Sequence, residues 1–399
     1  MDKNKSKLHV LIIPSEHFIT EWSPLGGIFQ LDLARGLRLA GNEVGILSVG
    51  RYPKSMIFLE KKYNKYEAID GVNVVRNYIQ FPLPFNLVGN RIYTWLFTKM
   101  ANRIYDEYVA RNGEPDIIHA HNFLYAGCVA ANISKRRKIP FVVTEHSSAA
   151  FTNGISAPTL SRLKAIAEFS SGVSAVSKKF YNVLKEKLNL NFNNFNIIPN
   201  ALPKEFEDLP IFDKTAQSGQ KFVFINVAEL ILIKNQQLLL QAFAKGFKKT
   251  NTCLKIIGDG PCKADLINLV NDLGISSQVE MLGRLNRTQV REHMRQSDSF
   301  VFSSDAETFG VVLIEALSQG LPVVSTDCGG PSDIITKNNG ILTQPKNLKE
   351  LTDAMCVMRN QRAQFDSLAI AIECHNKYGK TSIAKQYINF YLKAISEFK

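Results

Sequence analysis

Short apolar runs alternate with longer amphipathic stretches along the first half of the chain. The apolar runs suit buried β-strands, and they fall at residues 8–13, 43–49, 72–79, 116–121, 140–146 and 172–177. The stretches between them carry apolar residues three and four apart, which predicts helices at residues 26–41, 90–111, 124–138, 159–169 and 178–188. Regular alternation of buried strand and amphipathic helix predicts a parallel α/β sheet.

The same alternation restarts after a break near the middle of the chain. Residues 199–220 contain prolines and show no periodicity, which predicts a linker. Strands are then expected at residues 222–228, 253–258, 279–283, 299–304 and 321–326, and helices at 347–359, 363–376 and 380–397. A chain of 399 residues exceeds the size at which one core keeps growing. We therefore expect two Rossmann-like domains, with ligands held at the carboxyl ends of their strands.

The segment 303–332 carries the strongest functional signal in the sequence. Glu307 and Glu315 are eight residues apart, a little over two helical turns, and a helical pattern begins between them at Gly310. The backbone amides of Phe309, Gly310 and Val311 would be free at the start of that helix, where anions bind readily. Two carboxylates flanking such amides suit a ligand that contains a sugar, a diphosphate and a ribose.

This segment resembles the E-x7-E signature of the retaining glycosyltransferases of the GT4 type, which have the GT-B fold. The resemblance implies two Rossmann-like domains, residues 1–200 and 201–378, that face each other across a cleft. A C-terminal helix at 379–399 would return to the first domain. It also implies that Glu307 orients the donor sugar, Glu315 binds the ribose and the amides of Phe309 to Val311 hold the diphosphate.

Further motifs match the donor-binding loops of the family. Gly26 and Gly27 follow the first strand and open a helix, so they offer free amides near the diphosphate, although a simple tight turn is an alternative explanation. Gly258 and Gly260 lie in IIGDGP, the turn where the family packs the nucleotide against main chain. Leu282 lies in MLGRL, where the family holds the base mainly through backbone groups.

Two histidines are candidates for the reacting face. His119 and His121 end a predicted strand in DIIHAHNF, and being two apart they share one face of it. His121 matches the family histidine that contacts the transferred sugar and acceptor region. His146, at the end of another predicted strand, is a possible second cleft or acceptor residue. A structural role is the alternative for each.

The chain departs from its family at residues 227–235. The family pattern is approximately V-A/G-R-L-x-x-x-K-N/G, with arginine and lysine on the diphosphate, whereas this chain reads VAELILIKN. Lys234 is in place, but Glu229 occupies the arginine position, where a carboxylate would repel a diphosphate. Glu229 either points away, is offset by a cation such as Arg284 or Arg51, or marks reduced activity.

Charge and composition narrow the choice of partners. The net charge of +12 is concentrated in residues 1–200, which hold 25 Lys and Arg against 15 Asp and Glu, while residues 201–399 hold 23 against 21. No nucleic-acid-binding motif accompanies the basic half, so an anionic membrane surface is the expected partner, with a solvated surface as the alternative. Residues 76–111 interleave aromatic and basic side chains, which suits either an interfacial surface or a buried helix with snorkelling cations. They include Arg91, Tyr93, Trp95, Phe97, Lys99, Arg103 and Tyr105.

The sequence also bears on compartment and cofactors. The six cysteines form no C-x-x-C pair, and there is no signal pattern, so we expect a cytoplasmic protein, with a peripheral position on the inner face of the plasma membrane as one form of this expectation. No D-x-D pattern ends a predicted strand, and we expect neither a metal nor a cofactor. Lys234 and the helix N-terminus would replace the cation.

The expected function is a retaining glycosyltransferase. It would move a sugar from a UDP- or GDP-sugar to a glycan acceptor, polyprenyl-linked in our interpretation, during polysaccharide or glycoconjugate assembly. His121, Lys234 and Glu307 would be catalytic. The alternatives are a GT-B nucleotide-sugar epimerase, a phosphorylase-like enzyme, and a non-catalytic or low-activity partner subunit, the last suggested by Glu229.

Overall fold

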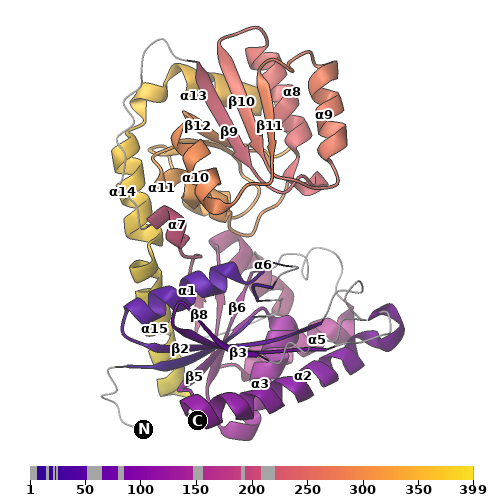
Figure 1. Cartoon of the computed structure of the whole chain (residues 1–399), viewed down its shortest axis with the longest axis vertical. Coiled ribbons are helices and arrows are strands. Elements are labelled where there is room, and N and C mark those ends of the chain that lie inside the picture. The colour runs from indigo at the N-terminus through magenta and orange to yellow at the C-terminus, as the bar shows by residue number, and fades with distance from the viewer. Residues whose placement is uncertain are drawn as a thin grey trace. The chain divides into compact units, whose positions relative to one another are not determined.

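The computed structural model describes residues 7–14, 18–20, 23, 26–51, 65–79, 85–146, 156–189, 194–207 and 221–398. The chain forms two compact units. Unit 1 contains residues 1–201 together with 380–399, and unit 2 contains residues 202–379. Each unit is built on its own β-sheet (Figure 1).

Unit 1 contains a sheet of eight strands in the order β3-β4-β2-β1-β5-β6-β7-β8. Its strands are β1 (His9–Ile13), β2 (Glu43–Arg51), β3 (Lys65–Ile69), β4 (Val72–Ile79), β5 (Ile117–His121), β6 (Phe141–Glu145), β7 (Gly172–Ala175) and β8 (Phe195–Ile197). Every neighbouring pair is parallel except β3 and β4, which are antiparallel. The strand order reverses direction between β1 and β5.

Helices cover the sheet of unit 1. They are α1 (Ile28–Leu39), α2 (Phe85–Asn112), a π-helical turn η2 (Phe123–Gly127), α3 (Cys128–Arg137), α5 (Ala157–Phe169), α6 (Lys178–Leu188) and α15 (Lys380–Glu397). Val10 and Ile12 of β1 belong to one core cluster with residues of α1 and α15. Leu11 and Ile13, which alternate with them, are also fully buried, so both faces of the strand are covered and the run is continuously apolar.

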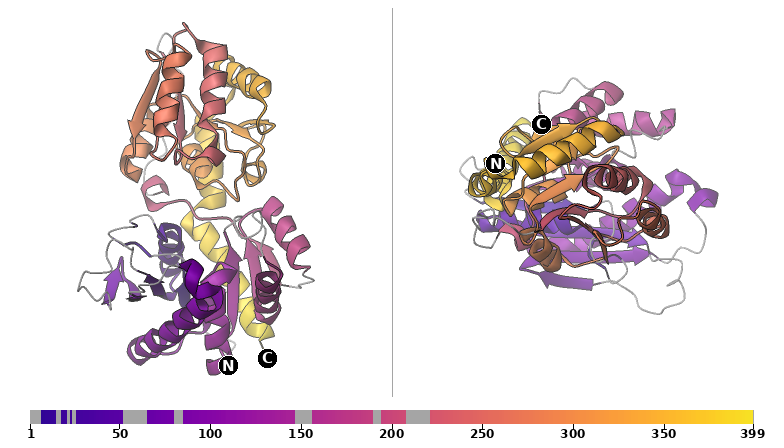
Figure 2. Two further views of the ribbon diagram at one scale, coloured as in Figure 1. Left: turned by 90° about the vertical axis from the view of Figure 1, so that its right-hand side faces the viewer. Right: turned by 90° about the horizontal axis from the view of Figure 1, so that it is seen from above.

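The last helix lies on the unit that contains the first strand. Ile383, Tyr387 and Tyr391 of α15 are buried in the core cluster that also holds residues of β1. Figure 2 shows this yellow helix lying along the indigo and purple elements of unit 1. The two ends of the sequence therefore contribute to one core.

Unit 2 contains a sheet of six parallel strands in the order β11-β10-β9-β12-β13-β14. The strands are β9 (Phe222–Val227), β10 (Thr252–Ile257), β11 (Val279–Gly283), β12 (Ser299–Phe302), β13 (Val323–Thr326) and β14 (Gly340–Thr343). Its helices are α7 (Lys204–Glu207), α8 (Gln236–Phe247), α9 (Lys263–Asp272), α10 (Arg287–Arg295), α11 (Val311–Ser318), α12 (Pro331–Ile334), α13 (Leu348–Asn360) and α14 (Ser367–Tyr378), with 3₁₀ turns η3 (Leu232–Lys234) and η4 (Arg362–Gln364).

The predicted fold class is confirmed: the protein is an α/β protein with two parallel-sheet domains and a C-terminal helix. Three strands were not predicted, namely β3, β8 and β14. Each is short and is an outermost strand of its sheet, and charged residues interrupt the apolar ones in β3. None of the three therefore forms a long apolar run. Of the predicted linker at 199–220, residues 204–207 form α7, while 208–220 lie outside the described residues.

Candidate active site

The strand order of unit 2 reverses between β9 and β12. Strands β10 and β11 lie on one side of this point, and β13 and β14 lie on the other. In open parallel sheets, ligands bind at such a reversal, outside the carboxyl ends of the strands. The loops that follow β9 and β12 are residues 228–235 and 303–310, and these contain Lys234 and Glu307.

The structure brings Lys234 and Glu307 together as an ion pair. Lys234 closes the 3₁₀ turn η3, and its Nζ lies 2.6 Å from Oε2 of Glu307. Both side chains are about one-fifth exposed, at 21% and 19%. The two loops are also joined by Asp305, whose backbone N–H donates to the Ile233 carbonyl over 2.8 Å and whose carboxylate accepts from Asn235. An ammonium group has three N–H donors, so Lys234 can hold Glu307 and still donate to a ligand.

The loop that carries Glu307 is fastened to the segment following β13. The Glu307 N–H donates to the Cys328 carbonyl, and the Glu307 carbonyl accepts from the Gly330 N–H over 2.8 Å. A Cβ at position 329 would overlap that same carbonyl, and Gly329 has φ +138°, so only glycine fits. The TDCGG sequence after the strand therefore positions the Glu307 loop.

The amides at the start of α11 are available for an anion. Within the described residues, the N–H groups of Phe309, Gly310 and Val311 have no hydrogen-bond acceptor. Gly310 has φ +96°, which turns the chain into the helix, and the Phe309 ring is buried against Tyr378. Glu315 lies in the helix with only 9% of its surface exposed. Free amides, a cation and two carboxylates at one sheet edge can bind a phosphate and hydroxyl groups.

Gly258 and Gly260 have a structural role in the chain itself. Both have positive φ. A Cβ at position 258 would overlap the backbone carbonyl of Ala228, and a Cβ at position 260 would lie 2.5 Å from the backbone carbonyl oxygen of Leu230. They therefore allow the turn after β10 to lie against the loop that leads to Lys234. Leu282 in β11 is partly exposed. The donor-binding role of these three residues stays a prediction.

Glu229 points into solvent. Its side chain is exposed, and it forms no hydrogen bond or ion pair with any described residue. Its backbone carbonyl accepts from the Gln236 side chain over 3.0 Å. Pairing with Arg284, one of the predicted alternatives, is therefore absent, and the side chain of Arg51 lies outside the described residues. The structure leaves the side chain at position 229 exposed, within the same loop as Lys234.

In unit 1 the strand order reverses between β1 and β5, and the loop after β1 contains Gly26 and Gly27. The expectation that both amides are free is wrong for Gly26, because its N–H donates to the Ser23 carbonyl over 3.1 Å. Gly27 has φ +71°, and a Cβ there would lie 2.7 Å from the Phe18 ring. This glycine pair therefore forms part of a tight turn, which was the alternative explanation. Its contribution to donor binding stays a prediction.

His121 and His146 form a hydrogen-bonded pair at the carboxyl ends of β5 and β6. The Nδ1 atom of His121 lies 2.8 Å from Nε2 of His146, and the ring planes differ by 11°. Phe29 of α1 contacts both rings, with centroid distances of 6.1 and 4.7 Å. Burial lowers the pKa of His146 to about 3 and holds the pKa of His121 well below its usual value. Both rings are therefore neutral at pH 7, and one nitrogen of the pair donates while the other accepts.

His119 connects this pair to the last helix of the chain. Its ring centroid lies 4.2 Å from that of His121, and its Nδ1 and Nε2 lie 2.7 Å from the Tyr391 hydroxyl and the Thr144 hydroxyl. Thr144 is 2.6 Å from the Ser174 hydroxyl. Desolvation lowers the pKa of the fully buried His119 well below its usual value. Sequence reasoning missed Tyr391, because no local signal links a residue of the final helix to a histidine 272 positions away.

Asn122 is a second residue that sequence reasoning missed. It follows His121 directly, has φ 72°, and its side-chain oxygen accepts from the His146 backbone N–H over 2.9 Å. Asparagine tolerates this left-handed φ better than most residues, and such backbone strain concentrates at functional sites. The HAHNF sequence already contained this residue beside the histidines, but only the structure shows what it holds.

The aromatic and basic stretch 76–111 divides between core and surface. Phe97 and Tyr105 are buried, whereas Trp95 is 59% exposed and has the Lys99 ammonium 5.3 Å above its ring. The side chains of Arg91 and Tyr93 lie outside the described residues. Along the described helices, none combines the length and the apolar character needed to span a bilayer.

The described residues contain no group of three or more His, Cys, Asp or Glu side chains arranged to hold a metal ion. The expectation of a reaction without metal or cofactor stays a prediction. Within the described part of the site, Lys234 offers a cation and the start of α11 offers a helix dipole.

Two family models match the chain. The model for Glycosyltransferase Family 4 matches residues 27–206, and the model for Glycosyl transferases group 1 matches residues 208–364. The second match includes all of β9 and β12, between which the strand order of unit 2 reverses, whereas the first match begins after β1.

Relatives match over nearly the whole length. The N-acetyl-alpha-D-glucosaminyl L-malate synthase of Bacillus anthracis is 25% identical over 94% of this chain and 95% of its own. The putative teichuronic acid biosynthesis glycosyltransferase TuaC of Bacillus subtilis is 23% identical over 90% of this chain and 96% of its own.

Solved structures show the same fold. Sucrose-phosphate synthase from Thermosynechococcus elongatus has a TM-score of 0.74 at 17% identity, and the alignment covers 97% of this chain and 99% of that one. HepE from Anabaena, solved in complex with UDP, has a TM-score of 0.68 at 19% identity over 96% and 99%. At these identities the likeness shows the fold.

Proposed function

This chain belongs to the group 1 and family 4 glycosyltransferases, and from that premise we propose that it is a retaining enzyme acting on a nucleoside-diphosphate sugar. The observation that carries the proposal is the Lys234–Glu307 pair beside the free amides at the start of α11. Two acidic groups, one cation and a helix N-terminus at the carboxyl edge of a parallel sheet form the set that such a donor requires.

We assign the parts of the donor to separate groups. The diphosphate binds the N–H groups of Phe309, Gly310 and Val311 together with Lys234, which stabilises the negative charge that develops as the sugar leaves. Glu307 accepts hydrogen bonds from the sugar hydroxyls, and Glu315 accepts them from the ribose. The UDP and UDP-glucose complexes of HepE support a nucleotide-sugar donor. UDP- and GDP-sugars are both compatible with this assignment.

The histidine pair of unit 1 is proposed to act on the acceptor. A neutral histidine ring carries a single N–H. If Nδ1 of His121 donates in the hydrogen bond to His146, Nε2 of His121 is an acceptor, and if Nδ1 accepts, Nε2 is a donor. His146 thus sets the tautomer of His121.

In the proposed reaction the acceptor oxygen bonds to the anomeric carbon as the bond to the phosphate breaks on the same face. The departing phosphate takes the proton of the acceptor, so the configuration is retained and no metal takes part.

A glycan carried on a polyprenyl lipid is the proposed acceptor, and the inner face of the plasma membrane is the proposed location. The basic balance of residues 1–200 and the exposed Trp95 with Lys99 support a surface that meets anionic lipid. Co-sedimentation with anionic liposomes that declines as salt rises is the expected behaviour. Equal binding to neutral liposomes would contradict it.

The decisive experiment measures nucleotide release and product together. The protein is incubated with UDP- and GDP-sugars and a lipid-linked acceptor extract, and both free nucleoside diphosphate and glycosylated lipid are quantified. Acceptor-dependent release of nucleotide with a new lipid-linked product is expected. An epimerase would change the sugar without acceptor-dependent release.

Glu229 favours one competing function, a partner subunit that binds donor without turnover. Its exposed carboxylate replaces the arginine of the family pattern, and no described cation neutralises it. Tight nucleotide-sugar binding with no product from any acceptor extract would support this alternative.

A further inference from the structure

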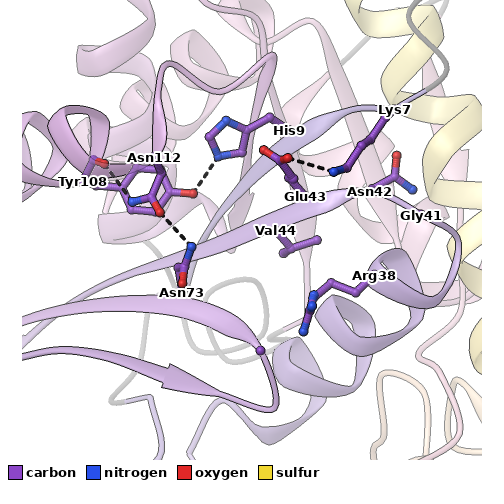
Figure 3. A pocket seen from close by; sticks show the side chains of 11 residues that line it. Lys7, His9, Arg38, Gly41, Asn42, Glu43, Val44, Asn73, Tyr108 and Asn112 are labelled. Atoms are coloured by element: carbon purple, nitrogen blue, oxygen red, sulfur yellow. Dashed lines mark hydrogen bonds and ion pairs between the residues drawn. The ribbon is translucent and has the colours of Figure 1, made fainter.

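A polar cavity lies near the amino ends of β1 and β2 in unit 1, whereas the histidine pair lies at the carboxyl ends of β5 and β6. Its volume is about 490 Å³, within the range of small-molecule sites. Figure 3 shows side chains entering it from β1, β2, β4, α1 and α2. Lys7, His9, Arg38, Asn73, Tyr108 and Asn112 are among those that line it.

The cavity is separate from the candidate active site. His9 is the first residue of β1, whereas Gly26, Gly27 and His121 lie at the carboxyl ends of β1 and β5. These strands are parallel and rise about 3.3 Å per residue. The five residues of β1 therefore place roughly 13–16 Å between the amino ends and the carboxyl ends of the strands. A molecule in the cavity would not touch the histidine pair.

Two glycines allow the walls of the cavity to form. A Cβ at position 45 would overlap the Tyr108 hydroxyl, which lies 2.7 Å from Nε2 of His9. A Cβ at position 71 would overlap the Arg38 guanidinium, which donates to the Asp70 carbonyl over 2.6 Å. Both glycines are therefore required for these side chains to occupy their positions.

Some lining groups are already paired and fix the shape of the cavity. His9 has partners at both ring nitrogens, and Asn112 accepts from Tyr66 and Asn73 while donating to the Tyr108 carbonyl. Hydrogen bonding within this wall keeps its side chains in one arrangement, so the cavity is formed before any ligand arrives.

Other lining groups keep capacity for a ligand. Toward described residues, Arg38 uses one of its five N–H donors, and Lys7 uses one of three in its ion pair with Glu43. The side-chain oxygen of Asn73 has no partner among the described residues. Donors and acceptors are therefore both available around one space.

The charge balance argues against a strongly anionic ligand. Lys7 and Arg38 are offset by Glu43 and by the carboxyl-terminal ends of α1 and α2, each carrying about half a negative charge. An apolar ligand would find few partners besides Val44 and the ring of Tyr108. A hydroxyl group both donates and accepts, so a polyhydroxylated neutral molecule matches this lining.

We propose that this cavity is a second, non-catalytic binding site for a saccharide unit. It would hold a sugar away from the reacting centre, either as a distant unit of a glycan or as a free ligand. Binding alone tests the site, whatever reaction the protein performs.

The test is saturation-transfer NMR on the full chain with glucose, galactose or N-acetylglucosamine, each with excess UDP present. Transfer to at least one sugar is expected, and it should decrease at least fivefold in Asn73→Leu and in Arg38→Met. Arg38 is exposed, so its replacement keeps the test valid even if Asn73→Leu fails to fold. Arg103→Met, at an exposed arginine of α2 that does not line the cavity, is the matched control and should leave transfer unchanged.

Three outcomes would overturn the proposal. They are no transfer to any of the sugars, transfer that persists in both variants, and loss of transfer when inorganic phosphate is added at the concentration of the sugar. The last would identify an anion site. The UDP signal in the same samples reports on the donor site, so failure of the proposed function is visible separately.

Discussion

The ammonium of Lys234 lies 2.6 Å from the carboxylate of Glu307, although 73 residues separate them in the sequence. The pair joins the two loops at the point where the strand order of unit 2 reverses. Each partner keeps the other oriented. A donor diphosphate would find the cation already in place, which reduces the cost of ordering a lysine side chain on binding.

Replacing Lys234 with Ala should lower kcat by about 10²–10³, because the transition state loses a charged stabiliser. It also leaves Glu307 without its counter-ion. Lys349→Ala is the matched control, since Lys349 forms an ion pair with Asp353 at an exposed position on α13 of the same unit. Turnover equal to wild type in Lys234→Ala would show that the phosphates are held elsewhere.

Glu307→Gln and Glu315→Gln should have different kinetic signatures. Ribose is present in substrate and product alike, so Glu315→Gln should weaken nucleoside-diphosphate binding and raise KM. Glu307 contacts the moving sugar, so its replacement should mainly lower kcat. Calorimetry with UDP and GDP alongside steady-state kinetics separates the two. An equal loss of nucleotide affinity in both variants contradicts the assignment.

Glu229→Arg should tighten nucleoside-diphosphate binding by roughly ten- to a hundredfold. The carboxylate is exposed and has no described partner, so its removal breaks no contact, and one charge-assisted hydrogen bond is worth about 1.5–3 kcal/mol. Glu373→Arg, an exposed position on α14, controls for the change in net charge. Calorimetric titration with UDP and GDP measures the effect, and unchanged affinity for both would mean that position 229 does not face the donor.

Unit 1 should lose stability as the pH falls below about 6.5. His146 has a pKa of about 3 in the folded protein and an ordinary pKa of 6.5 in the unfolded chain. Between these two pKa values the unfolded chain binds a proton that the folded chain does not, so acid favours unfolding. This costs about 1.4 kcal/mol per histidine between pH 7.5 and 5.5. Both tryptophans, Trp22 and Trp95, belong to unit 1, so urea denaturation followed by their fluorescence reports on this unit.

The His146→Gln variant should show a smaller loss of stability over the same pH range, by about 1.4 kcal/mol. His119 and His121 continue to contribute in that variant, because burial lowers their pKa values too. An undiminished pH dependence in His146→Gln would mean that His146 does not titrate as a buried neutral ring.

Tyr391→Phe should destabilise unit 1 by about 1–3 kcal/mol, because it leaves Nδ1 of the buried His119 without a partner. Tyr387→Phe removes a hydroxyl from the same helix, one turn earlier, but that hydroxyl lies 3.4 Å from Thr144 and contacts no histidine nitrogen in the described structure. Tyr391→Phe should also change the NMR signals of the His119 ring nitrogens, whereas the control should not. Equal effects of the two variants would show that the hydrogen bond to His119 makes no specific contribution to stability.

Much of this protein could be predicted from consecutive residues. Apolar runs and helical periodicity are local properties, so they identified most strands and helices and the restart of the pattern near residue 222. The spacing of Glu307 and Glu315 is likewise visible in one dimension, because both belong to one loop and the helix that follows it. The family resemblance depended on these same local motifs.

Tertiary structure decided what pairs with what. The contact of Lys234 with Glu307 requires β9 and β12 to be neighbours, and that of His119 with Tyr391 requires the last helix to join the core of the first sheet. The glycines at 258 and 260 make room for the backbone at Ala228 and Leu230, a contact between two loops that no local pattern shows. Local pattern specifies elements, but the free energy of burying them against one another selects strand order, and strand order determines which distant side chains meet.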